Sequence, residues 1–352
     1  MKSTMIKLSS ISVALLVSAC GGGGGSDAPP ASPAVPANPN AYPAVTPSAG
    51  DWFVYTSTVT PTLPAGATAT EGTITRHYRI VNPDSSITRA DTRSTFTSLA
   101  SSAFNSSGAL VSYTSGTLLC NYAPAYRSGP PLTSVVGDAY SATSAESCAT
   151  QPNGTATVTN LSVASGSQVV ESKTIPLGTF GAFKYTQTLV ATSAASTTTT
   201  IESCWVDKVT GRTVECTSSY NTVPAGQTAI SARGTTLFQL QAYSFRGQAA
   251  VGAAVRRFAG YWNVTFAGTS IGDCANLLID INGQISGSCR TLTSAGVYAP
   301  SYAVSGSISA SGAATVTATT GASLFGTFTS PEAANGTWTN TGASGTWTAT
   351  HI

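Results

Sequence analysis

The C-terminal part of the chain alternates apolar and polar residues with a period of two, which is the pattern of a half-buried β-strand. Trp262, Val264 and Phe266, for example, are separated by polar residues. Asn282-Gly283 lies between two such segments and favours a tight hairpin. We therefore predict eight short antiparallel strands, which are Tyr261–Ala267, Cys274–Asp280, Gln284–Thr291, Tyr302–Ser309, Ala313–Thr319, Ser323–Thr329, Gly336–Thr339 and Gly345–Thr350.

Eight strands of even spacing predict an up-and-down β-barrel or a tight sandwich over residues 258–352. A barrel of this size has room for a packed core or for one small ligand. Exposed tryptophans could stack on sugars or anchor a protein partner, whereas buried ones belong to the core. We expect Trp262 and Trp338 to be core residues.

Residues 50–247 also show strand patterns and turn signals, without a convincing helix. The predicted strands are Trp52–Thr60, Thr73–Val81, Ser86–Arg93, Leu110–Cys120, Ala156–Val163, Gln168–Pro176, Phe180–Ala191, Thr197–Asp207, Arg212–Ser219 and Ala229–Phe245. A weakly helical connection, Gly247–Arg257, follows, and we expect its basic pair to be solvated. The predicted fold class is all-β, with an N-terminal antiparallel β domain and a C-terminal eight-stranded barrel or sandwich.

The N-terminus has the layout of a secretory signal. Lys2 and Lys7 precede a short apolar segment, Ile11–Leu16, and Val17-Ser18-Ala19 stands directly before Cys20. The apolar segment is far shorter than the ~20 residues that cross a bilayer as a helix, which disfavours a transmembrane helix. A cleaved signal that leaves Cys20 unmodified is the alternative to lipidation.

The run before Cys20 resembles the bacterial lipobox. This resemblance implies that residues 1–19 are a signal peptide and that Cys20 carries diacylglycerol, with a third acyl chain, such as palmitate, on its amine. Gly21, where an Asp would retain the protein in the inner membrane, implies delivery to the outer membrane. Several acyl chains anchor a protein almost permanently, whereas one chain binds marginally. The periplasmic and the surface-exposed orientation both stay open.

The charge balance and the cysteines agree with an exported protein. Lys and Arg number 16 and Asp and Glu number 14, so removal of Lys2 and Lys7 leaves a formally neutral chain, which argues against nucleic acid as a partner. Six cysteines remain after Cys20, and an oxidising compartment favours three disulfides. Proximity in the sequence favours Cys120–Cys148, Cys204–Cys216 and Cys274–Cys289, although other pairings are possible. None has CxxC spacing, so we predict no metal and no cofactor.

Residues 20–49 are predicted to be a tether. Five glycines follow Cys20, and prolines then recur among alanines and serines up to Pro47. The stretch has no periodic apolar face, and proline offers no backbone donor. Folded structure is therefore expected to begin near Gly50.

Two further runs resemble envelope proteins. Leu324–Trp338 resembles a signature of small barrels in transferrin-binding-protein-like surface lipoproteins, and the matching positions are Gly326, Phe328, Pro331, Ala333, Gly336 and Trp338. It departs from the signature at Ser330, where the family has Gly, and in one further strand near the C-terminus. The resemblance implies a surface-displayed barrel that supports partner binding. Gly178–Lys184, with Trp205 and Gly211, resembles a pattern of envelope lipoproteins with curved antiparallel sheets.

Residues that could carry catalysis are few. Ser270 stands in a G-x-S-x-G pattern, but a nucleophile elbow needs a helix after it and a histidine within reach, and a strand follows here. His77 and His351 are isolated in the sequence. The best carboxylate cluster flanks one hairpin, where Glu202 and Glu215 could be cross-strand neighbours, and nearby Lys208 and Arg212 favour a solvated charge group.

The sequence as a whole predicts an outer-membrane-anchored lipoprotein that is a non-enzymatic binding or interaction module at the cell envelope. Its ligand, a protein or a small molecule, is not specified by any motif. The first alternative is a structural or assembly lipoprotein that faces the periplasm. The second is an envelope hydrolase.

Overall fold

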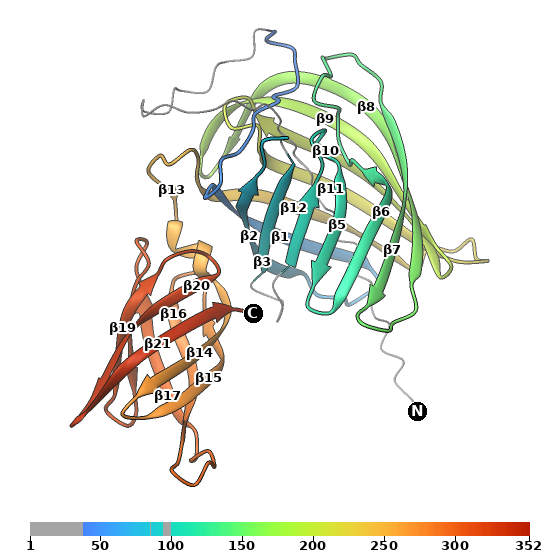
Figure 1. Cartoon of the computed structure of the whole chain (residues 1–352). Helices are drawn as coiled ribbons and strands as arrows, with labels where there is room; N and C mark the ends of the chain where they lie inside the picture. The colour runs from blue at the N-terminus through green and yellow to red at the C-terminus, as the bar shows by residue number, and fades with distance from the viewer. Residues whose placement is uncertain (1–37, 85, 94–99) are drawn as a thin grey trace.

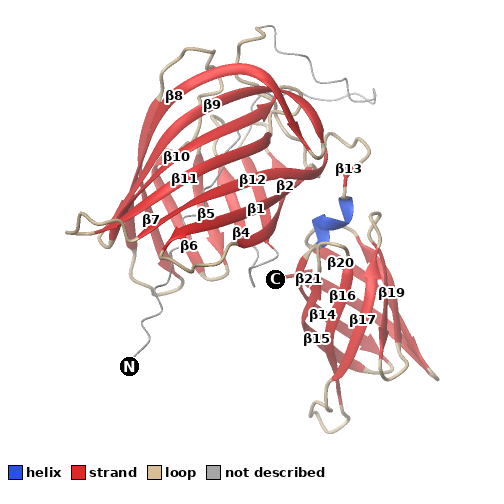
Figure 2. Cartoon of the chain, turned by 180° about the vertical axis from the view of Figure 1, so that it is seen from behind, coloured by secondary structure: helices blue, strands red, loops and turns tan. Residues whose placement is uncertain are grey.

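The computed structural model describes residues 38–352 except 85 and 94–99. It consists of two antiparallel β-barrels joined by a short helical turn, as Figures 1 and 2 show. The predicted signal peptide, Cys20 and the first part of the tether lie outside the described residues. The all-β prediction is confirmed. No helical segment in the described part of the chain has the length and hydropathy of a membrane span.

The larger barrel is a meander in which each strand pairs with the next and β1 pairs with β12, which closes the ring. Its strands are β1 (Trp52–Leu63), β2 (Thr70–Val81), β3 (Ile87–Arg93), β4 (Ala100–Phe104), β5 (Leu110–Ser115), β6 (Leu118–Tyr126), β7 (Ser141–Thr150), β8 (Thr157–Ile175), β9 (Gly178–Ser193), β10 (Ser196–Asp207), β11 (Thr213–Pro224) and β12 (Ala232–Ser244). A two-residue strand, β13 (Val251–Gly252), pairs with the end of β12.

The strands of this barrel differ from the prediction at four places. The predicted strand Leu110–Cys120 is two strands, because Gly116 adopts a φ of 57° that turns the chain between β5 and β6. The two strands predicted between residues 156 and 176 are one long strand, β8, with a bulge between Ser165 and Gln168. β4 and β7 were not predicted, because both are rich in alanine and serine, which give little β-propensity signal.

The interior of the larger barrel combines aromatic rings with buried charge. Tyr55 stacks on Phe238 with ring centroids 4.4 Å apart, and the Arg76 guanidinium lies 5.0 Å from the centre of the Phe238 ring. Arg89 donates to Asp91 over 2.7 Å, and both side chains are buried. A buried charge is stable only when paired or solvated by hydrogen bonds, so these groups must hold fixed positions.

The end of the predicted tether belongs to the folded barrel, which corrects the expectation that packing begins near Gly50. Tyr42 is 2% exposed, and its ring meets Phe183 edge to face at 5.3 Å. Its backbone N–H donates to the Ser134 carbonyl over 2.8 Å, and Arg212 donates to the Val45 carbonyl. Tyr42, Pro43, Val45 and Pro47 are all buried, so this segment, which we call the plug, packs as part of the larger barrel.

The smaller barrel confirms the predicted eight strands, and its β14 pairs with β21 to close it, so it is a barrel and not a sandwich. Its strands are β14 (Gly260–Gly268), β15 (Ile271–Ile279), β16 (Gln284–Leu292), β17 (Tyr302–Ile308), β18 (Ala313–Ala318), β19 (Ser323–Phe328), β20 (Ala333–Asn340) and β21 (Ala343–His351). Trp262 and Trp338 are buried, as predicted for core residues.

One end of the smaller barrel is closed and faces the larger barrel. The 3-10 helix η1 (Ala254–Phe258) lies at this end, and Phe258 and Trp262 are fully buried beside it. The Arg257 guanidinium lies 4.8 Å from the centre of the Trp52 ring on β1, so this arginine packs between the barrels and is not the solvated residue that the sequence predicts. Glu332, in the turn before β20, binds the larger barrel through His77 and Arg79 of β2.

Three disulfides join adjacent strands, and they are the pairs that proximity in the sequence favours. Cys120–Cys148 links β6 to β7, Cys204–Cys216 links β10 to β11, and Cys274–Cys289 links β15 to β16. The last two close short loops with sequence separations of 12 and 15 residues. A loop of this length corresponds to roughly 3 kcal/mol of stabilisation through restriction of the unfolded chain.

Candidate ligand-binding site

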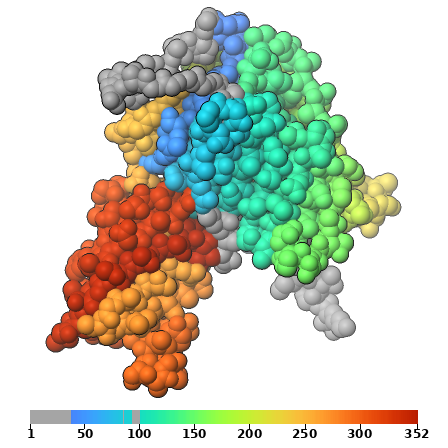
Figure 3. All heavy atoms as spheres, viewed as in Figure 1, coloured from blue at the N-terminus to red at the C-terminus, as the bar shows by residue number. Residues whose placement is uncertain are grey.

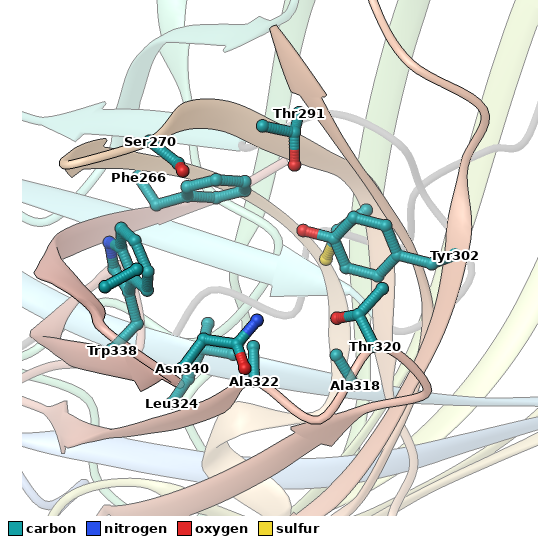
Figure 4. A pocket seen from close by; sticks show the side chains of 12 residues that line it. Phe266, Ser270, Thr291, Tyr302, Ala318, Thr320, Ala322, Leu324, Trp338 and Asn340 are labelled. Carbon is teal, nitrogen blue, oxygen red and sulfur yellow. The ribbon is translucent and has the colours of Figure 1, made fainter. Parts of the chain in front are cut away.

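The smaller barrel is hollow at the end that points away from the larger barrel. A cavity of about 180 Å³ lies there, between strands and the loops that connect them (Figure 4). The loop after β16 projects beyond this end in Figure 3. Buried core side chains occupy the barrel beneath the cavity, where Leu277, Phe328 and Trp347 are among the residues that border a small apolar void of about 20 Å³.

The apolar part of the cavity wall comes from six strands of the barrel. These residues are Phe266, Cys289, Tyr302, Ala318, Leu324 and Trp338. Trp338 is held in place because its indole N–H donates to the Ala267 carbonyl over 3.0 Å, and its ring meets Phe266 edge to face at 6.0 Å. Gly345 leaves space for the Trp338 indole, because the Cβ atom of any other residue at this position would lie 2.6 Å from Trp338 Nε1.

The polar part of the wall lies toward the mouth and carries no carboxylate, amine or guanidinium. Figure 4 shows the hydroxyls of Thr291, Tyr302 and Thr320 and the side-chain amide of Asn340 directed toward the space. These four groups come from β16, β17, the β18–β19 loop and β20. The cavity therefore offers hydroxyl and amide groups around an aromatic floor, which is the composition of a site for a neutral ligand.

Charged groups near the mouth lie on the outside of the wall. Arg290 donates to Asp273 over 2.8 Å, and its guanidinium also stacks on the Tyr298 ring at 3.9 Å. The hydrogen bond from Arg290 holds the pKa of Asp273 below its usual range. Asp273 and Arg290 thus neutralise each other at the outer surface and impose no charge on the cavity.

The residues considered for catalysis are not brought together. Ser270 borders the cavity, whereas His351 lies at the closed end of the same barrel, because Trp262 pairs with His351 and Gly268 pairs with Gly345. His351 is buried against Trp262, and burial lowers its pKa. His77 belongs to the larger barrel and contacts Glu332 over 3.1 Å.

The predicted carboxylate cluster at the β10–β11 hairpin is wrong in two respects. Glu202 pairs with Ser218, and Glu215 pairs with Trp205, so the two carboxylates are not cross-strand neighbours. Glu202 faces the barrel interior and is 1% exposed, while Glu215 is on the other face of the hairpin and forms an ion pair with Lys173. Arg212 is also buried, with its guanidinium 5.0 Å from the centre of the Tyr78 ring. The hairpin is therefore not a solvated charge group.

Glu202 was not predicted to lie in the barrel interior, although its spacing from Cys204 indicates an interior position. It lies two residues before Cys204 and therefore on the same face of β10. Its Oε1 lies 2.6 Å from Cys204 Sγ, and Gln187 donates to it over 3.4 Å. Burial raises the pKa of Glu202 to about 8. A disulfide sulfur carries no hydrogen, so the carboxyl itself must be the donor in the contact with Cys204.

Two clusters in the described residues bring cysteines and a glutamate close together. They are Cys120, Glu146 and Cys148, and Glu202, Cys204 and Cys216. All four cysteines are disulfide-bonded, and metal ligation requires a free thiolate. These clusters therefore do not support a metal site.

Comparison with known proteins gives little further information. No family model matches the chain, and no curated protein matches its sequence. Among solved structures, a candidate lipoprotein from Parabacteroides distasonis matches with 14% identity and a TM-score of 0.24, over 56% of this chain and 97% of its own. Transferrin-binding protein B from Haemophilus parasuis, a vaccine antigen, matches with 9% identity and a TM-score of 0.19, over 88% of this chain and 78% of its own. At these TM-scores, neither likeness carries an inference about this chain.

Proposed function

We propose that this chain is a bacterial outer-membrane lipoprotein, anchored through Cys20, whose C-terminal barrel binds a ligand in the cavity at its free end. The observation that carries the proposal is the cavity itself, which is open at the end away from the larger barrel and lined by aromatic and hydroxyl side chains. The signal-like N-terminus, the formal neutrality that removal of Lys2 and Lys7 would leave, and the cysteine usage support an exported, anchored protein.

A non-enzymatic role accounts better for this site than hydrolysis does. The cavity lining contains no histidine and no carboxylate, which are the usual general acids and bases. Ser270, the candidate nucleophile, has His351 at the opposite end of its barrel. We therefore assign the cavity to binding, with a structural or assembly role in the periplasm as the alternative.

Replacement of Cys20 with Ala is expected to abolish acylation, because no other residue at the processing site can form the thioether. Metabolic labelling of cells with a palmitate analogue should mark the wild type and leave the variant unlabelled and released from the membrane fraction. Ser26→Ala, a nearby change outside the motif, is the control and should keep the label. Label retained on Cys20→Ala would contradict the anchor.

Protease treatment of intact cells distinguishes the two faces of the membrane. Loss of the C-terminal barrel, with a periplasmic marker spared, would place the cavity outside the cell. Protection until the outer membrane is opened would place it in the periplasm, and copurification with an outer-membrane complex would then favour the assembly role.

The binding half of the proposal predicts that some small molecules stabilise the protein through the cavity. A thermal-shift screen of a chemically diverse library should give compounds that raise the melting temperature of the wild type. The same compounds should not stabilise Ala322→Phe, in which a benzyl group fills the mouth. Ala303→Phe, on the exposed outer face of β17, is the matched control. A library without any cavity-dependent stabiliser would contradict the binding role.

A further inference from the structure

The size of the cavity limits the ligand to one ring. Its volume is about 180 Å³, and an apolar protein cavity of about 150 Å³ accommodates benzene. The buried core beneath it, with a void of about 20 Å³, leaves no room for a long chain to extend into the barrel. The ligand, or the part of it that enters, is therefore a single ring with one or two small substituents.

The lining selects the chemistry of that ring. Phe266 and Trp338 form a rigid aromatic corner, and Leu324 completes an apolar floor. Aromatic rings pack favourably edge to face or offset against such a corner. A pyranose could stack one C–H face on an aromatic ring, but hydroxyls surround the rim of its ring, and those turned toward the apolar floor would lose their hydrogen bonds on burial.

The hydroxyls and the amide near the mouth define where a polar substituent would lie. Among the described contacts, the Tyr302, Thr291 and Thr320 hydroxyls make no hydrogen bond toward the cavity, and Asn340 uses its Oδ1 to accept from the Thr341 backbone N–H. The Asn340 Nδ2 is thus directed inward as a donor in Figure 4. With no charged side chain in the lining, an ionised ligand would be desolvated without a partner.

From these observations we infer that the cavity binds a neutral, single-ring aromatic compound with one hydrogen-bonding substituent, its ring against Phe266 and Trp338 and its substituent beside Tyr302 and Asn340. The inference rests on the proposed binding function and specifies the class of ligand for it. The ring of the bound ligand therefore lies deepest, on the aromatic floor, and its substituent lies at the mouth, where the polar groups are.

The test is a titration of the full chain with three probes, in which isothermal calorimetry and ligand-observed NMR measure binding. 4-Methylphenol is the neutral aromatic probe, benzoate is its charged counterpart and glucose is the saccharide. We expect 4-methylphenol to bind with one-to-one stoichiometry, and benzoate and glucose to bind at least tenfold more weakly. Ala322→Phe should lower the affinity for 4-methylphenol at least tenfold, and Ala303→Phe should leave it unchanged.

Tyr302→Phe separates the polar contact from the shape of the cavity. It keeps the ring and removes the hydroxyl, so loss of one hydrogen bond predicts an affinity for 4-methylphenol that is about fivefold lower. No binding of 4-methylphenol to the wild type, or equal binding to Ala322→Phe, would overturn the inference. Cavity-dependent binding of glucose or benzoate instead would overturn only the ligand class and leave the proposed function standing.

Discussion

Replacement of Glu202 with Gln is expected to remove a fall in stability that the wild type shows as the pH rises from about 4.5 to about 8. Glu202 is fully buried, its Oε2 has no hydrogen-bond partner, and burial raises its pKa from 4.5 to about 8. In the folded protein the carboxyl keeps its proton across this range, whereas in the unfolded chain it loses it.

This difference in proton binding determines whether stability rises or falls with pH. Below about pH 4.5 both states are protonated, and Glu202 imposes no electrostatic cost. Above it the unfolded chain binds fewer protons, so the free energy of unfolding decreases by at most about 1.4 kcal/mol per pH unit until the folded carboxyl also ionises. Gln is isosteric and neutral, so Glu202→Gln should lack this decrease and be more stable than the wild type at the upper end of the window.

Urea unfolding at several pH values, followed by far-ultraviolet circular dichroism, measures this effect. The control is Glu171→Gln, because Glu171 is on the outer face, where the hydrogen bond from Trp205 holds its pKa below the usual range. That carboxylate titrates below the window, so its replacement should leave the slope unchanged. Parallel curves for the wild type and Glu202→Gln would show that Glu202 is ionised or exposed, contrary to the structure.

Replacement of Trp262 with Ala is expected to destabilise the smaller barrel by about 3–5 kcal/mol. Trp262 is fully buried at the closed end, where its ring meets Phe328 at 4.6 Å and His351 at 4.9 Å. Its indole N–H donates to the Phe258 carbonyl over 2.9 Å, so the substitution also frees the end of η1. The cavity left behind cannot collapse easily, because the barrel wall is hydrogen-bonded around its whole circumference.

Hydrogen exchange measured by mass spectrometry tests this prediction, because it reports the protection of backbone amides in each barrel separately. Peptides from β14 to β21 should lose protection in Trp262→Ala, while those from β1 to β12 should keep it. Phe325→Ala removes another aromatic ring from the same barrel, but Phe325 is 48% exposed, so this control should cost little. Equal protection in Trp262→Ala and the wild type would mean that the closed end does not hold the barrel together.

Local patterns in the sequence predicted most of the strands and the class of fold, and they favoured the cysteine pairs that the structure shows. The alternation around Trp262 and the hairpin at Asn282-Gly283 act over two to four residues, so they can be recognised without knowing the rest of the chain. The cysteine pairs are also local, because each disulfide joins neighbouring strands of a meander. Where propensity is weak, as in β4 and β7, the same approach fails.

Only the tertiary structure decided which residues are enclosed. The larger barrel closes by pairing Trp52 with Ser244, a contact between the two ends of the domain that no local pattern encodes. That closure makes one face of each strand an interior, and it places Glu202 and the plug residue Tyr42 inside. The cavity also depends on closure of a barrel, because it is the space left between side chains that come from separate strands. Periodicity can tell that a strand has two faces, but enclosure depends on how distant strands come together in space.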